Sequence, residues 1–599
     1  MRWKTITDAI FRYYKSTWPF ILTFVLLIGY NCIEGTVSFI TKNTMEDMAN
    51  ASIYYFFSKV CFVFFLASIT SALLFLRWKR PVKFTLYFII IFLFFLQRFL
   101  ISNFDCQIGT EVALLIYETN SVEASGFLST FAFCPATIKC YLQVAMVILF
   151  IVFLEFIGKK QARLHLPRVF KVVVSLLCFM MFSIGGIHSK VYLRLFNCND
   201  MEELARWQGS ERTRFSDLVT KVMYSIEGLR ITGNEIKRAS DVILKYHDSP
   251  VSCVSEDSLN VVFVIGESCI LNHMSIYGYP HDTNPCMMRE KEKGNLFLFS
   301  DVVSPYQKTS PTIKNLLSCN SMSDGENWSD YPYLPYLFKK AGYNIFFWDN
   351  QRDMVKGSGQ ALSLNSFVYN KKITPVYDKV NDVCFSYDDE LISSFIKSFS
   401  LSAGGKYNFV MFHLLGQHLP SRTYYPNNGK YDYFIVDSIQ RNEKWITVEK
   451  KQYIAEFDNA TRYNDMVLGK MFDYFRNTRT VILYLSDHGE EVYDYRDTMG
   501  RRIDTEHITK EVIDYQFRVP FMIWISDSYR ESFPQIIDLM KKGAARKFMT
   551  DNTYNVLFHL GFIKTEFYRS THDILSEDFV PAKRLLLGKT DCDSIINEK

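Results

Sequence analysis

The chain contains 599 residues, which is too long for a single compact domain, and its formal net charge is only +4. So small a charge argues against a strongly basic nucleic-acid-binding protein, and no nucleic-acid partner is expected. The composition is 48% hydrophobic and 22% charged, but long hydrophobic stretches concentrate before residue 190. The first third of the chain therefore differs in character from the remainder.

Five stretches in the first third are long and apolar enough to cross a membrane as helices. They occupy residues 18–40, 54–76, 82–101, 141–157 and 170–187. A cleavable signal peptide is an alternative for the first stretch, but no small-residue cleavage site follows it and four further apolar stretches do. The sequence predicts a five-helix transmembrane domain over residues 1–190.

The lysines and arginines between these stretches predict the orientation, because positively charged loops stay on the cytoplasmic side. Basic residues fill the N-terminal tail and the second and fourth connections: Arg2, Lys4, Arg12, Lys15, Arg77, Lys79, Arg80, Lys83, Lys159, Lys160, Arg163, Arg168 and Lys171. The first connection, residues 41–52, has only Lys42, and the third, residues 102–137, has no lysine or arginine. We expect a multi-pass protein of the bacterial inner membrane, with everything after residue 187 in the periplasm.

The 13 cysteines differ in their predicted surroundings. Cys32, Cys61 and Cys178 lie within the hydrophobic stretches as small apolar residues, and Cys140 lies at the membrane boundary. The others face an oxidising compartment, where disulfides can form in pairings that the spacing does not fix: Cys106, Cys134, Cys198, Cys253, Cys269, Cys286, Cys319, Cys384 and Cys592. No CxxC pair is present, which argues against a cysteine-based zinc site.

The segment 191–257 is charged and mixed, and it contains apolar residues at helical spacing. These residues are Phe215, Leu218, Val219, Val222, Met223 and Ile226. The pattern predicts amphipathic linker helices. They would either lie along the membrane surface or pack beneath the domain that follows, and packing is the interpretation we favour.

The remainder, residues 258–599, alternates short apolar runs with helical patterns. The runs are VVFVIG at 261–266, YNIFFW at 343–348, YNFVMFHLLG at 407–416, VILYLSD at 481–487 and VPFMIWIS at 519–526. Such alternation predicts an α/β domain with a mostly parallel sheet flanked by helices on both faces. The polar residues that follow the runs should therefore converge on one edge of the sheet.

Three potential metal ligands follow two of these runs. Glu267 ends the first run as IGES, and Asp487 and His488 end the run VILYLS. Carboxylate and imidazole ligands together suit a zinc ion that keeps one coordination position open for catalysis. An isolated Asp-His pair is more often an acidic turn, and Glu267 alone is equally suited to cap a helix, so the inference depends on the three occurring together.

A polar turn within SPYQKTSPTIKNLLS supplies candidate nucleophiles ahead of a helical pattern. It contains Thr309, Ser310 and Thr312, and position alone does not choose among them. A hydroxyl at a helix N-terminus lies where backbone N–H groups favour a phosphate, and a nearby metal can stabilise its alkoxide. For any single serine or threonine, helix capping is the commoner role.

Histidines provide further candidates around the same edge. His413 and His418 flank the turn in FHLLGQHLP, just after an apolar run. His418 is the better candidate to contact a phosphate, a second metal or a leaving group, and His413 is expected to pack beside its strand. His507 follows the Asp-His pair by a long loop, and a surface position is at least as consistent with the sequence. Glu490 either joins the site or orients His488.

The order GES…Thr…HxxGxH…SDHGE behind five predicted spans resembles the bacterial phosphoethanolamine transferases, which are membrane-anchored members of the alkaline phosphatase and sulfatase superfamily. The similarity is densest at residues 261–285, 299–309, 341–351, 413–418 and 484–494. The motifs HLLGQH and WDNQ are more similar to the branch that modifies lipopolysaccharide core than to the lipid A branch. The absence of cysteines flanking the threonine segment points to the same branch.

The resemblance implies a metal site and a nucleophile. It implies that Glu267, Asp487 and His488 bind zinc and that Thr309 is both a ligand and the nucleophile. One zinc ion is expected, and the resemblance allows a second.

The resemblance also implies residues that contact the substrate. His418 matches a histidine near the transferred phosphate or a second metal, and His507 matches a later histidine only loosely. Asn350 or Gln351 would contact the phosphoethanolamine.

The implied reaction is transfer of phosphoethanolamine from phosphatidylethanolamine to a cell-envelope glycolipid, through a phosphorylated threonine, by an enzyme expected to be monomeric. The acceptor would be lipopolysaccharide core or lipid A.

The main alternative is a phosphoglycerol transferase that uses phosphatidylglycerol and commonly manganese. A sulfatase is disfavoured because no Cys-x-Pro-x-Arg sequence is present. A non-catalytic membrane scaffold is disfavoured because Glu267, Thr309, Asp487 and His488 are all present.

Overall fold

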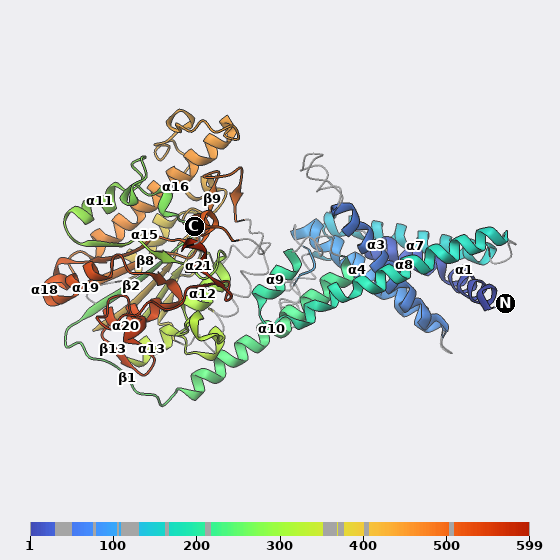
Figure 1. Ribbon diagram of the computed structural model, residues 1–599, viewed down its shortest axis with the longest axis horizontal. Coiled ribbons are helices and arrows are strands. Elements are labelled where there is room, and N and C mark those ends of the chain that lie inside the picture. The colour runs from blue at the N-terminus through green and yellow to red at the C-terminus, as the bar shows by residue number, and fades with distance from the viewer. Residues whose placement is uncertain are drawn as a thin grey trace. The chain divides into compact units, whose positions relative to one another are not determined.

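The computed structural model describes residues 2–29, 51–75, 79–104, 107–109, 131–161, 167–209, 217–351, 368, 376–399, 406–501 and 508–597. The chain divides into two compact units, one built mainly from Met1–Asn234 and the other mainly from Glu235–Val355 and Gln360–Lys599 (Figure 1). The first unit is helical, and the second contains the sheet.

The first unit is a bundle of long apolar helices. Its long helices are α1 (Arg2–Ile28), α3 (Ala51–Ala72), α4 (Lys79–Phe104), α7 (Pro135–Gln161) and α8 (Arg168–Leu193). Four segments of the described residues are long and apolar enough to cross a membrane: Phe56–Phe75, Arg80–Asn103, Pro135–Lys160 and Arg168–Asn197. They coincide with four of the five predicted spans. Helix α1 contains the start of the remaining one, whose residues 30–40 lie outside the described residues.

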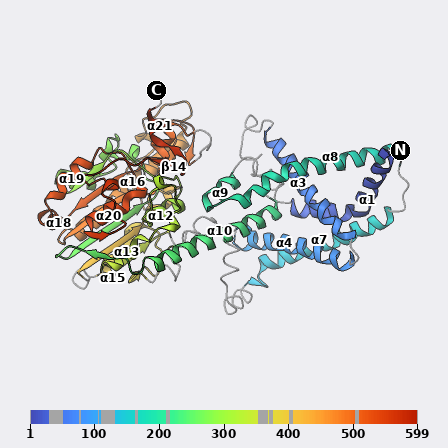
Figure 2. The ribbon, with the colours of Figure 1, turned by 60° about the horizontal axis from the view of Figure 1, so that its bottom comes forward.

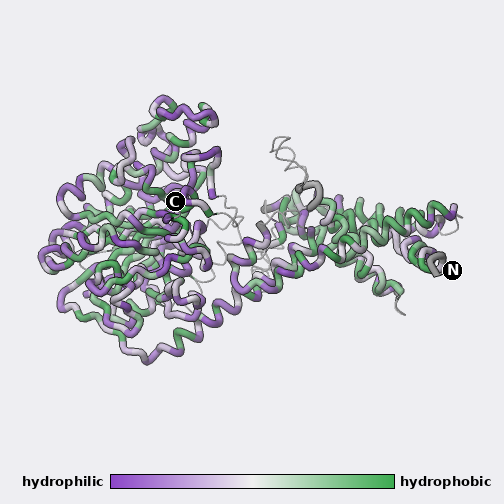
Figure 3. The backbone as a smooth tube through the Cα atoms, viewed as in Figure 1, coloured by the Kyte–Doolittle hydropathy of each residue, from purple (hydrophilic) through white to green (hydrophobic). Residues whose placement is uncertain are grey.

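The outer surface of α7 suits a lipid environment. Leu142, Met146, Leu149, Phe153 and Phe156 recur at helical spacing, and each is between 57% and 69% exposed. So continuous an apolar stripe is unfavourable in water, but it is what a bilayer requires of a spanning helix. The same apolar character extends over the long helices of this unit (Figure 3).

Two helices occupy the predicted linker: α9 (Met201–Gly209) and α10 (Leu218–Lys245). The predicted helical pattern is therefore present, although Phe215 lies outside the described residues. The C-terminal part of α10 packs on the core of the second unit through Ile236, Ala239 and Ile243. Its Glu235 also accepts a hydrogen bond from Lys314 Nζ at 2.8 Å.

The second unit is built on a seven-stranded sheet of order β3-β11-β8-β2-β7-β5-β6. Its strands are β2 (Leu259–Gly266), β3 (Leu296–Phe299), β5 (Asn344–Asp349), β6 (Lys379–Val380), β7 (Tyr407–His413), β8 (Thr480–Ser486) and β11 (Phe521–Ile525). Strands β2, β5, β6, β7 and β8 are mutually parallel. Each predicted apolar run forms a strand of this sheet.

The sheet is mixed, because β11 runs antiparallel to both of its neighbours, β8 and β3. The sequence predicts a mostly parallel sheet, and β11 is the strand that departs from that expectation. After β8 the chain stays at the C-terminal edge through the short hairpin of β9 (Glu491–Val492) and β10 (Met499–Gly500). It then re-enters the sheet from the same edge, where Phe521 pairs with Leu485, so β11 must run in the opposite direction.

Both faces of the sheet are covered, which explains why its strands are continuously apolar. Val261, Phe263 and Ile265 of β2 contribute to the core on one face, with α12 (Thr309–Leu316), α13 (Leu334–Lys340) and α20 (Thr553–Leu560) (Figure 2). Val262 and Val264 face the other core, which α15 (Asp388–Ser398) and α16 (Val448–Phe475) complete.

Short elements complete the second unit. They are β1 (Val251–Cys253), β4 (Val302–Val303), β12 (Phe548–Met549), β13 (Ile563–Thr565), β14 (Leu585–Leu586), β15 (Thr590–Asp591), α11 (Pro285–Glu292), α17 (Lys510–Val512), a π-helix (Ile513–Phe517), α18 (Asp527–Ser532), α19 (Gln535–Gly543) and α21 (Cys592–Asn597). All 11 cysteines in the described ranges are free thiols, so none of the possible disulfides is formed among them.

Candidate metal centre

The pairing of β2 with β8 brings the predicted ligands together. Ile265 is opposite Leu485 and Gly266 is opposite Ser486, so the next residues, Glu267 and Asp487, emerge side by side at the C-terminal edge. The Asp487 amide donates to the Gly266 carbonyl at 3.0 Å, which extends this alignment to the ligand itself. Two apolar strands thus place two carboxylates in one buried position.

Glu267, Asp487 and His488 form a compact group in which one ligand atom of each residue lies within 4.8 Å of the others. Nε2 of His488 is 3.0 Å from Asp487 Oδ2 and 3.3 Å from Glu267 Oε1, and all three side chains are fully buried. Apart from this approach of His488, Asp487 Oδ2 has no hydrogen-bond partner among the described residues. A buried carboxylate oxygen without a partner is unfavourable, and a bound cation removes that cost. Two carboxylates and an imidazole are a donor set that fits zinc.

Thr309 joins this group from the first turn of α12. Its Oγ1 donates to Glu267 Oε2 at 2.9 Å and lies 3.2 Å from His488 Nε2. Thr312, one of the other candidate hydroxyls, instead lies 3.3 Å from the Tyr306 carbonyl, to which it donates. The backbone N–H groups at the start of a helix favour an anion, so the position of Thr309 suits a phosphoryl group.

Charge in the centre favours an ionised Glu267. Burial alone raises the pKa of this carboxyl, but the imidazoles of His488 and His418 and the guanidinium of Arg501 outweigh burial and lower the pKa well below its usual range. Glu267 is therefore a carboxylate at neutral pH. An ionised carboxylate is the form that binds a metal.

The turn HLLGQH lies against the backbone of Glu267. A Cβ atom on Gly416 would lie 2.6 Å from the Glu267 carbonyl oxygen, and Gly416 has a φ of +52°, so only glycine fits there. The Gln417 amide donates to the same carbonyl at 3.0 Å. Asp388 accepts from the amides of Leu415 and Gly416 and fixes the turn.

The two histidines of this turn have different surroundings. His413 is buried, and its Nδ1 lies 3.0 Å from Asp349 Oδ1, as expected for a packed residue beside its strand. The ring of His418 packs edge-on against Tyr424, with centroids 5.7 Å apart, and its Nδ1 lies 2.8 Å from the Leu419 carbonyl. His507 lies outside the described residues.

Of the two candidate amides after β5, Gln351 reaches the centre. Its Nε2 donates to Glu267 Oε2 at 3.1 Å and to the Leu414 carbonyl at 2.6 Å. Asn350 instead donates to Asp388 Oδ1 at 3.0 Å and supports the turn. Consecutive side chains at a strand end point in opposite directions, which explains the difference.

Arg501 and Glu490 also contact the centre. Ser268 Oγ donates to Glu267 Oε1 at 2.7 Å and to Glu490 Oε2 at 3.0 Å. The Nε atom of Arg501 lies 3.2 Å from the same Glu490 oxygen, and its Nη1 contacts Nε2 of His488. Glu490 therefore reaches the centre through Ser268 and Arg501. Arg501 was not predicted as a site residue from the sequence, because no motif marks the position 13 residues after His488.

A second buried group of charges anchors the loop that carries these residues. His273 Nε2 lies 2.9 Å from Asp494 Oδ1, and its Nδ1 lies 2.5 Å from Asp458 Oδ1 in α16. His281 Nδ1 lies 2.6 Å from the other Asp458 oxygen. Because Asp494 belongs to the β9–β10 hairpin, this group ties the hairpin to the body of the domain.

This anchor predicts a pH-dependent stability. Burial alone lowers the pKa of His273, but Asp458 and Asp494 outweigh burial and raise the pKa to about 10. A histidine whose pKa is higher in the folded than in the unfolded state stabilises fully below about pH 6.5, and this stabilisation is lost as pH rises toward 10. His273→Gln should therefore destabilise the protein by a few kcal/mol at pH 6 and by much less at pH 10.

Thermal unfolding of wild type and His273→Gln across that range measures the difference. His281→Gln is the control, because His281 is 19% exposed at its side chain and pairs with one carboxylate, so its effect should be smaller. A stability gap for His273→Gln that stays constant from pH 6 to pH 10 would contradict this assignment of charge.

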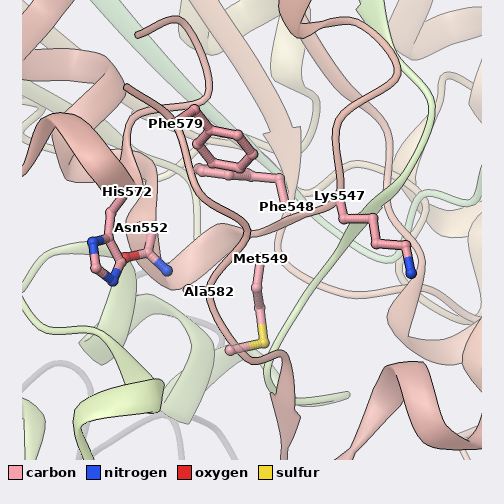
Figure 4. Close-up of a pocket in the computed structure, with 7 residues that line it drawn as sticks. All are labelled: Lys547, Phe548, Met549, Asn552, His572, Phe579 and Ala582. Atoms are coloured by element: carbon pink, nitrogen blue, oxygen red, sulfur yellow. The ribbon is translucent and has the colours of Figure 1, made fainter. Parts of the chain in front are cut away.

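The described surface also contains a small pocket in the C-terminal part of the domain (Figure 4). It is lined by Lys547, Phe548, Met549, Asn552, His572, Phe579 and Ala582. None of these is a candidate ligand. The chemical character of the centre at Glu267 identifies the candidate site.

Comparison with known proteins yields one family match. Residues 259–554 match the model of the Sulfatase family. The match contains all four residues of the candidate centre.

The chain is also similar to named transferases, which confirms the resemblance inferred from the motifs. It is 24% identical over 497 residues to phosphoethanolamine transferase EptC of Escherichia coli (strain K12), covering 80% of this chain and 79% of the relative. It is 27% identical over 337 residues to phosphoethanolamine transferase CptA of Salmonella typhimurium (strain LT2), covering 54% of each. The crystal structure of the C-terminal periplasmic domain of E. coli EptC aligns with a TM-score of 0.47 at 26% identity, over 56% of this chain and 91% of that one.

Proposed function

We propose that this chain is a membrane-anchored enzyme that transfers phosphoethanolamine from phosphatidylethanolamine to a cell-envelope glycolipid, either lipopolysaccharide core or lipid A. The observation that carries the proposal is the position of Thr309 Oγ1, between Glu267 and His488 in a buried group of metal ligands. The names of the relatives support phosphoethanolamine as the transferred group.

Glu267, Asp487, His488 and Thr309 would hold one zinc ion, and a second ion near His418 is compatible with the proposal. Zinc bound there would lower the pKa of the threonine hydroxyl and neutralise charge on the phosphoryl oxygens. Because Glu267, Asp487 and His488 are buried and the donor set is rich in oxygen, the site suits a small divalent cation rather than a monovalent one.

The reaction would proceed in two displacements at phosphorus. Thr309 Oγ1 forms a bond to the phosphorus of phosphatidylethanolamine, the bond to diacylglycerol breaks, and diacylglycerol leaves with the proton that the hydroxyl loses. An acceptor hydroxyl or phosphate then attacks the phosphothreonine, which regenerates Thr309. Gln351, which contacts Glu267, and His418, whose charge acts on Glu267, would contact the transferred group. We propose the same role for His507 from the sequence alone.

The membrane segment explains how the donor reaches the centre. In the proposed organisation, residues 1–190 form a multi-pass inner-membrane anchor, residues 191–257 form linker helices, and residues 258–599 form a periplasmic catalytic domain. The reacting phosphate of a phospholipid lies at headgroup level, and diacylglycerol returns to the bilayer after the first displacement. A monomer would suffice, because all four proposed ligands come from one chain.

The mass of the adduct on Thr309 tests the proposal. Purified full-length protein would be incubated with phosphatidylethanolamine, digested and analysed by mass spectrometry. We expect a phosphoethanolamine adduct on the peptide that contains Thr309. A phosphoglycerol adduct formed from phosphatidylglycerol would instead identify the alternative transferase, and an unmodified Thr309 with either lipid would contradict both.

A further inference from the structure

Arg501 places a positive charge inside the candidate centre. Its Nη1 contacts Nε2 of His488 and lies 4.0 Å from Glu267 Oε1, and it lies 3.4 Å from the Gln307 carbonyl, two residues before Thr309. We propose that Arg501 binds the non-bridging oxygens of the phosphoryl group on Thr309 and orients it for displacement. This proposal rests on the proposed function and adds a residue to it.

The hairpin after β8 determines where Arg501 lies. Met499 pairs with Val492 and Gly500 pairs with Glu491, so continuation of this register puts Arg501 opposite Glu490. Gly500 has a φ of +99°, a conformation that other residues rarely adopt, and a Cβ atom there would lie 3.7 Å from Glu490 Oε1. The backbone of this hairpin thus fixes the base of the Arg501 side chain.

The guanidinium lies close to the nucleophile. Nε2 of His488 contacts both Arg501 Nη1 and, at 3.2 Å, Thr309 Oγ1, so the two groups share one neighbouring atom. Glu490 holds the Nε side of the guanidinium, which directs the Nη side toward Thr309. If Glu267, Asp487 and His488 hold a metal, Arg501 Nη1 would be displaced from His488 and would be free to bind a phosphoryl oxygen of the group on Thr309.

Charge explains why a cation is needed at this position. Glu267, Asp487 and Glu490 place three buried carboxyl groups at the centre, and a phosphodiester brings a negative charge of its own. Arginine binds phosphate with two parallel N–H donors and remains protonated even when partly buried. The ligands are fully buried, whereas the Arg501 side chain is 23% exposed, so an incoming phosphate can reach it.

The competing role for Arg501 is a purely structural ion pair with Glu490. A structural pair would change protein stability but not phosphate affinity. Binding of inorganic phosphate to the zinc-loaded, full-length protein separates the two roles, because it requires neither lipid nor turnover.

Arg501→Gln and Arg501→Lys test the proposal against Arg496→Gln, a control in the same hairpin whose guanidinium pairs with Glu491. We expect Arg501→Gln to weaken phosphate binding and lower kcat/KM for transfer by about 10- to 100-fold. Arg501→Lys, which keeps the charge but loses the two parallel donors, should fall between that variant and wild type. Zinc content should remain at the wild-type level in all three variants, and Arg496→Gln should keep wild-type phosphate affinity.

Wild-type phosphate affinity in a folded Arg501→Gln variant would overturn the proposal. If Arg501→Gln fails to fold, Arg501→Lys carries the test, and wild-type affinity in that variant would overturn the two-donor contact. The adduct experiment on Thr309 decides the transferase proposal separately, because phosphate binding does not depend on which lipid donates the group.

Discussion

Thr309→Ala is expected to reduce phosphoethanolamine transfer by roughly 1,000-fold or more while leaving the protein folded. The substitution removes the hydroxyl that lies against Glu267 and His488. Side-chain loss at the first position of a helix has only a modest effect on stability. Transfer measured with fluorescent phosphatidylethanolamine and purified lipopolysaccharide gives the activity, and thermal unfolding checks the fold.

Two further variants test whether the Thr309 hydroxyl, rather than the adjacent Ser310 hydroxyl, is the nucleophile. Thr309→Ser keeps a hydroxyl and should retain measurable transfer, whereas Ser310→Ala removes the adjacent hydroxyl and should retain most of it. Full activity in Thr309→Ala, or loss of activity in Ser310→Ala instead, would reassign the nucleophile.

Removal of the metal is expected to abolish transfer and to lower the melting temperature by several degrees. A ligand that binds only the folded state at 1,000 times its Kd stabilises that state by about 4 kcal/mol, which corresponds to a shift of this size in a domain of a few hundred residues. Without a cation, Glu267 and Asp487 repel each other inside the protein. Dialysis against a chelator, followed by titration with zinc, should reverse both effects.

Asp487→Asn shows whether the shift comes from this centre. We expect the variant to lose the zinc-dependent rise in melting temperature. Asp497→Asn is the matched control, because Asp497 lies in the same loop, is 55% exposed and pairs with Lys450 away from the centre. A wild-type zinc response in Asp487→Asn would place the metal elsewhere.

The central strands and the edge that holds the ligands follow from the sequence because each signal is local. The run before Glu267 and the run before Asp487 are mainly apolar and are buried at every position, as expected of central parallel strands, and a charged residue follows each. The direction of β11 could not be predicted, because it depends on where the chain re-enters the sheet after the hairpin. The amino-acid composition of a strand does not indicate the direction in which the strand runs.

Some individual contacts at the site could not be predicted from the sequence either. Asn350 and Gln351 are adjacent amides at the end of β5, and a shift of one residue decides which of them reaches Glu267. Arg501 approaches His488 only because β9 and β10 pair. The pairing of two such short strands cannot be recognised from their residue types.

The pairing of β2 with β8 has a consequence for biogenesis. The Ser268 amide donates to Asp487 Oδ1 across 219 residues of chain, and non-local pairing of this kind forms late in folding. A chain that is still emerging, or one that stops before His488, therefore has no complete set of ligands. In the proposed enzyme, the finished polypeptide would therefore acquire its ion in the compartment in which the domain folds, and the metal supply of that compartment would determine how much active enzyme forms.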